Sequence, residues 1–66
     1  MTPGAYVESV RVEAARIALE SSDTAVEVVA LANGFGTVET MRRAFHRRLG
    51  VGPADYRSRF KSTQAA

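Results

Sequence analysis

Apolar residues recur at steps of three and four along most of this chain, and that spacing places them on one face of an α-helix. Over the first twenty residues the recurring apolar positions are Tyr6, Val10, Ala14 and Ile17. Thr2 followed by Pro3 is typical of a helix N-cap and first turn. The pattern predicts a helix from residue 2 to about residue 20, with the recurring positions turned towards the core. The Ser-Ser-Asp stretch at 21–23 ends it.

A second, shorter helix is predicted from the polar residues that bound it. Thr24 and Glu27 have the spacing of a capping box, in which each side chain accepts a hydrogen bond from the backbone N–H of the other residue. We expect this helix to run to about Ala32 or Asn33. Gly34 follows, and glycine adopts the positive φ with which many helices end.

Residues 37–49 are predicted to form a third helix, with Thr37 as its N-cap and an end near Leu49 and Gly50. Pro53 then opens a short last helix. We expect apolar side chains of these two helices to lie in the core, namely Met41, Phe45, Leu49, Tyr56 and Phe60.

The third helix has a polar side next to its apolar one. At about 100° per residue, its apolar residues fall together on the side expected to pack against the rest of the domain. The adjacent side carries Glu39, Arg42, Arg43 and His46, which are expected to point outwards. Such a helix is held rigidly by its neighbours while its charged side contacts something negative.

The composition limits what the chain can be. It has 66 residues, 45% of them hydrophobic, which suits one small domain with a small core. It contains no cysteine, so disulfides and thiolate metal sites are excluded. No apolar run approaches the roughly 18 residues of a membrane span, and no signal-peptide pattern opens the chain. We therefore expect a cytoplasmic protein that does not enter a membrane.

Charge is distributed unevenly along the chain, although the net charge is only +2. Residues 1–41 contain six carboxylates and two arginines, a net charge of −4, whereas residues 42–66 contain seven basic residues and one aspartate, a net charge of +6. This asymmetry favours a polyanionic partner, and a solvated basic helix face explains it equally well.

The order of the predicted helices and turn indicates which structural motif they form. A short helix, a glycine turn and a second helix with a basic outer side describe a helix-turn-helix. Ala30 lies four residues before Gly34, where a small side chain lets the two helices approach closely, and Phe35 fills the corner. The predicted fold is all-α, a small four-helix, homeodomain-like helix-turn-helix domain.

The sequence resembles the AraC/XylS family of bacterial transcription regulators. The resemblance is carried by GFGTVETMRRAFHRRLGVGPADYR, residues 34–57, which is similar to the second helix-turn-helix of that family. The residues that match its signature are Gly34, Phe35, Arg43, Phe45, Gly50, Pro53, Tyr56 and Arg57. At other signature positions Thr37 replaces serine, His46 replaces lysine and Gly52 replaces serine or threonine.

The resemblance also implies a domain organisation. The stretch YVESVRVEAARIAL looks like the long linker helix that precedes this motif in the family, and TPGAYV at 2–7 echoes GPADYR at 52–57. We therefore expect residues 1–61 to be the linker helix plus the second helix-turn-helix unit, and residues 62–66 to be a disordered tail. A first helix-turn-helix unit and a sensor domain are expected to be absent from this chain.

By analogy with the family, the helix over residues 37–49 is the recognition helix in the DNA major groove. The residues expected to face the bases are Val38, Glu39, Arg42, Arg43 and His46. Those expected to contact phosphates are Thr37, Arg47 and Arg48. Arg43 matches the family's arginine position and suits guanine, whereas Glu39 either accepts from cytosine or orients Arg43.

The predicted function is sequence-specific binding of double-stranded promoter DNA by a bacterial transcriptional regulator. The alternative is a protein-interaction module that contacts RNA polymerase or the missing N-terminal half. We do not expect an enzyme, because the sequence shows no nucleophile–base pair, metal cluster or phosphate loop. We expect no cofactor, no metal and no small-molecule ligand. A single histidine without cysteines or clustered carboxylates makes no metal site.

Overall fold

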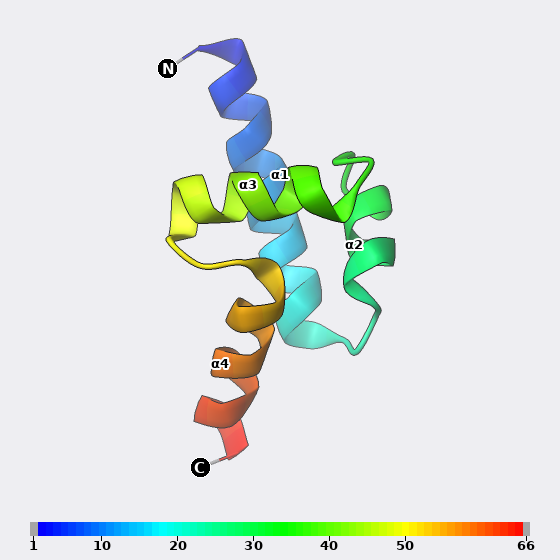
Figure 1. Ribbon diagram of the computed structural model, residues 1–66, viewed down its shortest axis with the longest axis vertical. Helices are drawn as coiled ribbons and strands as arrows, with labels where there is room; N and C mark the ends of the chain where they lie inside the picture. The colour runs from blue at the N-terminus through cyan, green and yellow to red at the C-terminus, as the bar shows by residue number, and fades with distance from the viewer. Residues whose placement is uncertain (1, 66) are drawn as a thin grey trace.

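The computed structural model describes residues 2–65, with side chains to residue 61, and contains four helices in that range. They are α1 (Pro3–Ser21), α2 (Val26–Ala32), α3 (Val38–Leu49) and α4 (Pro53–Ala65). Figure 1 shows α3 crossing in front of α1, with α2 to one side and α4 below. The predicted all-α, four-helix fold is confirmed.

Helix α1 is the element on which the other three pack. It begins as the sequence predicted, because Thr2 Oγ1 accepts a hydrogen bond of 3.1 Å from the Ala5 N–H and Pro3 occupies the first turn. Its buried side chains are Val12, Ala15 and Leu19. These lie at i, i+3 and i+7, so they form one stripe along the helix.

The predicted core face of α1 is wrong. Tyr6, Val10 and Ile17 are 63%, 52% and 51% exposed, and Ala14 is exposed as well. At about 100° per residue, that set lies on the opposite side of the helix from the buried stripe. Helix α1 is apolar on two opposite faces, so periodicity alone does not decide which face is buried. The other three helices pack on the face that carries Val12, Ala15 and Leu19.

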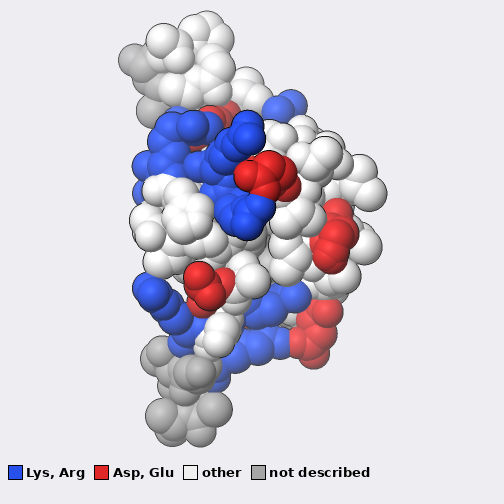
Figure 2. Space-filling view, viewed as in Figure 1, with Lys and Arg blue, Asp and Glu red and all other residues white. Residues whose placement is uncertain are grey.

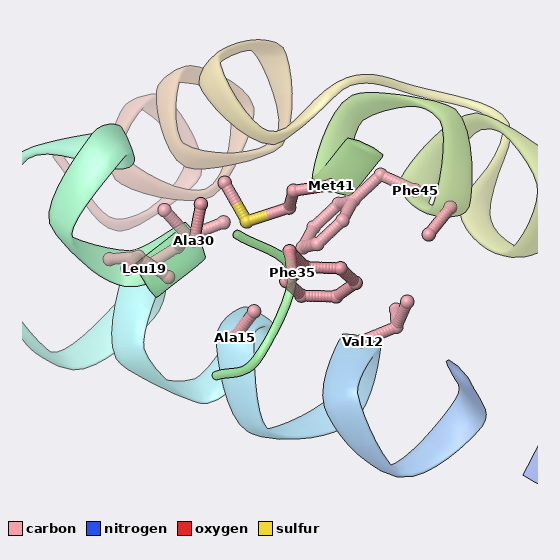
Figure 3. Close-up of a cluster of buried hydrophobic side chains, with 9 residues drawn as sticks. Val12, Ala15, Leu19, Ala30, Phe35, Met41 and Phe45 are labelled. Carbon is pink, nitrogen blue, oxygen red and sulfur yellow. The ribbon is translucent and has the colours of Figure 1, made fainter. Parts of the chain in front are cut away.

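The core combines large side chains with alanines. Phe45, Leu19, Met41 and Val29 are the largest fully buried side chains. Each of the first three helices also buries an alanine in the same cluster, and these are Ala15, Ala30 and Ala44. Figure 3 shows Phe35 and Phe45 side by side in this cluster. Small residues let the helix axes approach, and the large side chains then fill the remaining space.

The turn between α2 and α3 ends α2 in the way that its glycine predicted. Gly34 has a φ of +83°, and its N–H donates to the Leu31 carbonyl at 3.3 Å. The Phe35 N–H donates to the Ala30 carbonyl at 2.9 Å. This pair of bonds is a Schellman motif, which satisfies two carbonyls at the helix end and carries Phe35 into the core, where it is 9% exposed. The Arg11 side chain of α1 lies directly beneath Gly34.

The start of α2 differs from the predicted capping box. The helix begins at Val26, and Ala25, its N-cap, provides no side-chain hydrogen bond. Thr24 instead pairs with the preceding turn, where its N–H donates to Ser22 Oγ at 3.4 Å and the two hydroxyl oxygens lie 3.1 Å apart. Local side-chain bonding between these residues competes with capping.

Helix α3 begins as predicted, but one of the residues predicted to lie in the core is exposed. Thr37 is the N-cap, and its Oγ1 accepts from the Thr40 N–H at 3.1 Å. Leu49 was expected in the core but is 39% exposed. The buried residues of α3 include Ala44, which shifts the centre of the buried face so that Leu49 lies about 90° from it. Gly50, with a φ of +77°, then caps the helix.

Helix α4 begins at Pro53, as predicted, and returns across α1. Tyr56 is half-buried against the core, and its ring meets that of Phe45 edge to face at 6.3 Å. Phe60 is half-buried as well. The backbone of α4 is helical to Ala65, and the disordered tail expected for 62–66 stays a prediction. Residue 66 and the side chains of 62–66 lie outside the described residues.

Gly34→Ala is expected to lower the free energy of unfolding by about 1–2 kcal/mol, because an L side chain is strained at this positive φ. The measurement is urea denaturation followed by circular dichroism. The matched control is Gly4→Ala. Gly4 lies in the first turn of α1 with nothing within 4 Å of an added Cβ, so this change should leave stability unchanged or raise it. Equal effects of the two substitutions would contradict the turn's role.

Candidate nucleic-acid interface

The outward side of α3 carries most of the predicted site. Glu39, Arg42, Arg43, His46 and Arg47 are all exposed. The opposite side of the same helix is buried, so these side chains project from a backbone that is fixed by the core. Figure 2 shows Lys and Arg side chains gathered over α3, with acidic side chains among them, and a second basic group around α4.

Glu39 contacts both neighbouring arginines. Its carboxylate accepts a hydrogen bond from Arg42 Nη2, and Arg43 Nε lies 3.6 Å from its other oxygen. The sequence left two roles open for Glu39, and this geometry contains the i,i+4 pair that one of them requires. The Arg43 side chain is 71% exposed, so its guanidinium still projects into solvent.

Two predicted site residues are engaged with the domain itself. Val38 is half-buried and packs against the core, so only part of its side chain is presented outwards. Thr37 Oγ1 caps the helix and also donates to Thr40 Oγ1 at 3.0 Å. The backbone N–H groups of the first turn of α3 are what this end offers to an anion.

His46 and Arg42 border a depression between three helices. The start of α4 lies beneath them, and a Cβ added at Gly52 would lie 3.4 Å from His46 Nε2 and 3.8 Å from Arg42 Cγ. The residues that line the depression are Val26, Glu27, Val38, Arg42, His46, Gly52, Pro53, Ala54 and Asp55. The absence of a side chain at Gly52 lets both α3 side chains lie close over the α4 start.

Arg47 and Arg48 share one carboxylate of α1. Arg47 donates to Glu8 through Nε and Nη2, each at 2.9 Å, and Arg48 Nε donates to the same carboxylate at 3.2 Å. Arg48 Nη2 also donates to the Ala5 carbonyl at 2.6 Å. The Arg48 side chain therefore lies against α1 and is only 26% exposed, whereas the Arg47 side chain is 63% exposed.

These ion pairs shift the ionisation of their members. The Arg47 hydrogen bonds hold the pKa of Glu8 below its ordinary value of 4.5, and the Glu8 carboxylate raises the pKa of Arg47 in turn. A carboxylate whose pKa is lower in the folded than in the unfolded state stabilises the fold at pH values above its unfolded pKa. This stabilisation is lost as the pH falls from the unfolded pKa through the folded pKa. The contact between α1 and α3 is therefore acid-sensitive below about pH 4.5.

Other polar contacts were missed because their partners are distant in sequence. Arg57 Nε donates to the Leu19 carbonyl at 3.3 Å, which places a cation at the C-terminal end of α1. Arg16 Nη1 donates to Tyr56 Oη at 3.2 Å, and that hydroxyl donates to Glu20. Burial beside these groups raises the pKa of Tyr56. The sequence singled out Arg57 only through the resemblance, and Tyr56 through the resemblance and as an expected core residue, without indicating these partners.

Within residues 2–65, no three His, Asp or Glu side chains come together in a way that could hold a metal ion. The helices in that same part of the chain are too short or too polar to cross a membrane.

Comparison with known proteins places the chain among helix-turn-helix regulators. Residues 1–59 match the family described as the helix-turn-helix domain. The HTH-type transcriptional regulator Rv1931c of Mycobacterium tuberculosis (strain ATCC 25618 / H37Rv) is 53% identical over 58 residues, which cover 88% of this chain and 22% of that regulator. The chain thus spans about a fifth of the length of this relative. No solved structure gives a significant match.

Arg48→Ala is expected to lower the free energy of unfolding by about 1–2 kcal/mol, since it removes charge-assisted hydrogen bonds to Glu8 and the Ala5 carbonyl from a side chain that is 26% exposed. Arg43→Ala is the matched control, because Arg43 is on the same helix and pairs with Glu39 of that helix. Its loss should change stability little. Thermal unfolding of both variants makes the comparison, and an equal loss in the two would show that the α1 contact of Arg48 is not stabilising.

Proposed function

This chain belongs to the AraC-type family of helix-turn-helix transcriptional regulators, a DNA-binding family, and on that premise we propose that it binds promoter DNA sequence-specifically with α3 in the major groove. The observation that carries the proposal is the geometry of α3. Its Met41, Ala44 and Phe45 side is buried, while its arginine-bearing side is exposed. A rigid helix with a free polar face is what reading of base edges requires.

Arg43 is the principal base-reading residue in this proposal. A guanidinium donates two parallel hydrogen bonds to O6 and N7 of guanine, worth about 1–3 kcal/mol of discrimination. The side chain is 71% exposed and lies beside Glu39, whose carboxylate limits the directions in which Arg43 points. Arg42 and His46 reach neighbouring base edges, and the exposed part of Val38 contacts a thymine methyl.

Phosphate contacts flank the base-reading side. Arg47 projects from the C-terminal half of α3, and the N–H groups after Thr37 offer an anion site at its start. Arg48 is the weakest member of the predicted phosphate set, because its Nε and Nη2 already bond to Glu8 and the Ala5 carbonyl.

A second candidate function is a protein contact through α1. The outer stripe of α1, formed by Tyr6, Val10, Ala14 and Ile17, is exposed and lies opposite the core. An apolar stripe on both sides is typical of a helix that is covered on both sides. We favour another segment of a longer regulator as the occupant, because the related regulator is far longer than this chain. RNA polymerase is the other candidate.

The salt dependence of DNA binding tests the leading proposal. About three to five phosphate contacts predict a slope of about −3 to −4.5 when the logarithm of the binding constant is plotted against that of salt concentration. Fluorescence anisotropy of a labelled DNA duplex over a range of potassium chloride concentrations gives the slope. Binding that is independent of ionic strength, or no binding at the lowest salt, would favour the protein contact.

Arg43→Ala and Arg47→Ala are expected to differ in kind. Loss of Arg43 should relax the preference at one base position, by about 1–3 kcal/mol, because its contact is with a base edge. Loss of Arg47 should weaken binding about equally for all sequences and make the salt slope shallower by about 1, because its contact is with a phosphate. Both variants are compared on single-base changes of a site selected from a random duplex library. Indistinguishable profiles would contradict these roles.

A further inference from the structure

We propose that Glu8 of α1 is a positioning residue for DNA binding, which holds the Arg47 guanidinium in the orientation that meets a phosphate. The inference rests on the proposed function and extends the interface to a residue outside the helix-turn-helix. Glu8 is acidic and lies 39 positions from Arg47 in the sequence. Neither feature marks it as part of a DNA interface.

The first step is the hydrogen-bond arrangement. Arg47 meets the Glu8 carboxylate with two parallel bonds, Nε to Oε1 and Nη2 to Oε2, each of 2.9 Å. Paired bonds of this kind fix the plane of the guanidinium as well as its position. Arg48 Nε donates to the same Oε1 of this carboxylate, and Arg48 is itself fixed by the Ala5 carbonyl. The Arg47 orientation is therefore tied to the α1 backbone.

The second step is exposure. The Glu8 and Arg48 side chains are 24% and 26% exposed, whereas that of Arg47 is 63% exposed. A guanidinium has five N–H donors, and Glu8 occupies two of those on Arg47. The remaining three include both hydrogens on Nη1. A phosphate approaching from solvent meets these donors, while the carboxylate is recessed behind them.

Glu8 could help Arg47 to bind a phosphate or compete with the phosphate for Arg47, and the net charge of the group distinguishes the two. A carboxylate paired with one arginine would cancel its attraction for phosphate. Here two arginines share one carboxylate, so the group keeps a net charge of +1. Loss of Glu8 would add a unit of positive charge but would also free a long side chain, which must then be ordered on binding. Ordering such a side chain weakens binding by about two- to tenfold.

The test is a double-mutant comparison on a labelled mixed-sequence DNA duplex at constant ionic strength, since a phosphate contact needs no particular sequence. Glu8→Gln removes the charge and keeps the shape. The matched control is Glu13→Gln, which removes the same charge from α1 at a residue that is 58% exposed and paired with Arg16 of its own helix. Both are made in the native chain and in Arg47→Met, which keeps the apolar stem without the guanidinium.

In the native background, Glu8→Gln is expected to bind about two- to tenfold more weakly than Glu13→Gln. In the Arg47→Met background, the two are expected to bind equally, because Glu8 then has no Arg47 to position. Weaker binding by Glu8→Gln in both backgrounds would mean that it acts on the fold, and this overturns the inference.

Binding by Glu8→Gln that equals or exceeds that of Glu13→Gln in the native background would also overturn it, since Glu8 would then be a bystander or a competitor of phosphate. If the native chain fails to bind the duplex at low salt, the proposed function fails and the inference fails with it. That outcome is distinguishable, because no variant then shows binding.

Discussion

The buried stripe of α1 is the contact on which the arrangement of the domain depends. Val12, Ala15 and Leu19 belong to the buried core, and α1 packs against the other three helices more extensively than any of those helices packs against its neighbours. Because Ala15 is small, the neighbouring helices approach α1 closely enough for Phe45 and Met41 to be fully buried. Burial of these two side chains sets the rotation of α3 about its own axis. The direction in which the α3 arginines point is thus a consequence of packing on α1.

Two carboxylates restrain the arginines on the basic side of α3. Glu39 contacts Arg42 and Arg43 along the helix, and Glu8 joins Arg47 and Arg48 across the crossing of α1 and α3. The pairs made by the exposed Arg42, Arg43 and Arg47 add little stability one by one. They reduce the conformational freedom of the arginines instead, because each pair restricts a long side chain that would otherwise sample many rotamers. A surface that is ordered before binding loses less entropy when a partner arrives.

Helix α1 has two apolar sides, and among the residues that the structure describes one of them is buried and the other exposed. The inner stripe carries the core, and the outer stripe is exposed over more than three turns, from Tyr6 to Ile17. Exposed apolar groups arranged in a row on one helix favour a contact surface over isolated surface residues. This stripe faces away from the core and α3 packs on the core side, so a protein contact there and DNA binding by α3 are geometrically compatible.

Local chemistry in the sequence determined the helices, the N-caps of α1 and α3, and the turn. Thr2, Thr37 and Gly34 act where the pattern placed them, because a cap or a positive φ depends on a few neighbouring residues. On α3 the charged positions leave a single apolar side, so its outward residues also followed from spacing. Arg48 and Val38 are the exceptions. Arg48 bonds to a carboxylate and a carbonyl of α1, and Val38 packs against the core.

What the tertiary structure alone decided is which side of α1 would be buried and which charges would meet across the crossing. Apolar residues lie on both sides of α1, so periodicity supports either orientation equally, and the Thr24 cap was likewise lost to a competing contact with Ser22. Pairing between Glu8 and Arg47 spans 39 positions and depends on the angle at which two helices cross. Spacing along one helix carries no information about that angle, because it is set by how the side chains of several helices fill a shared volume.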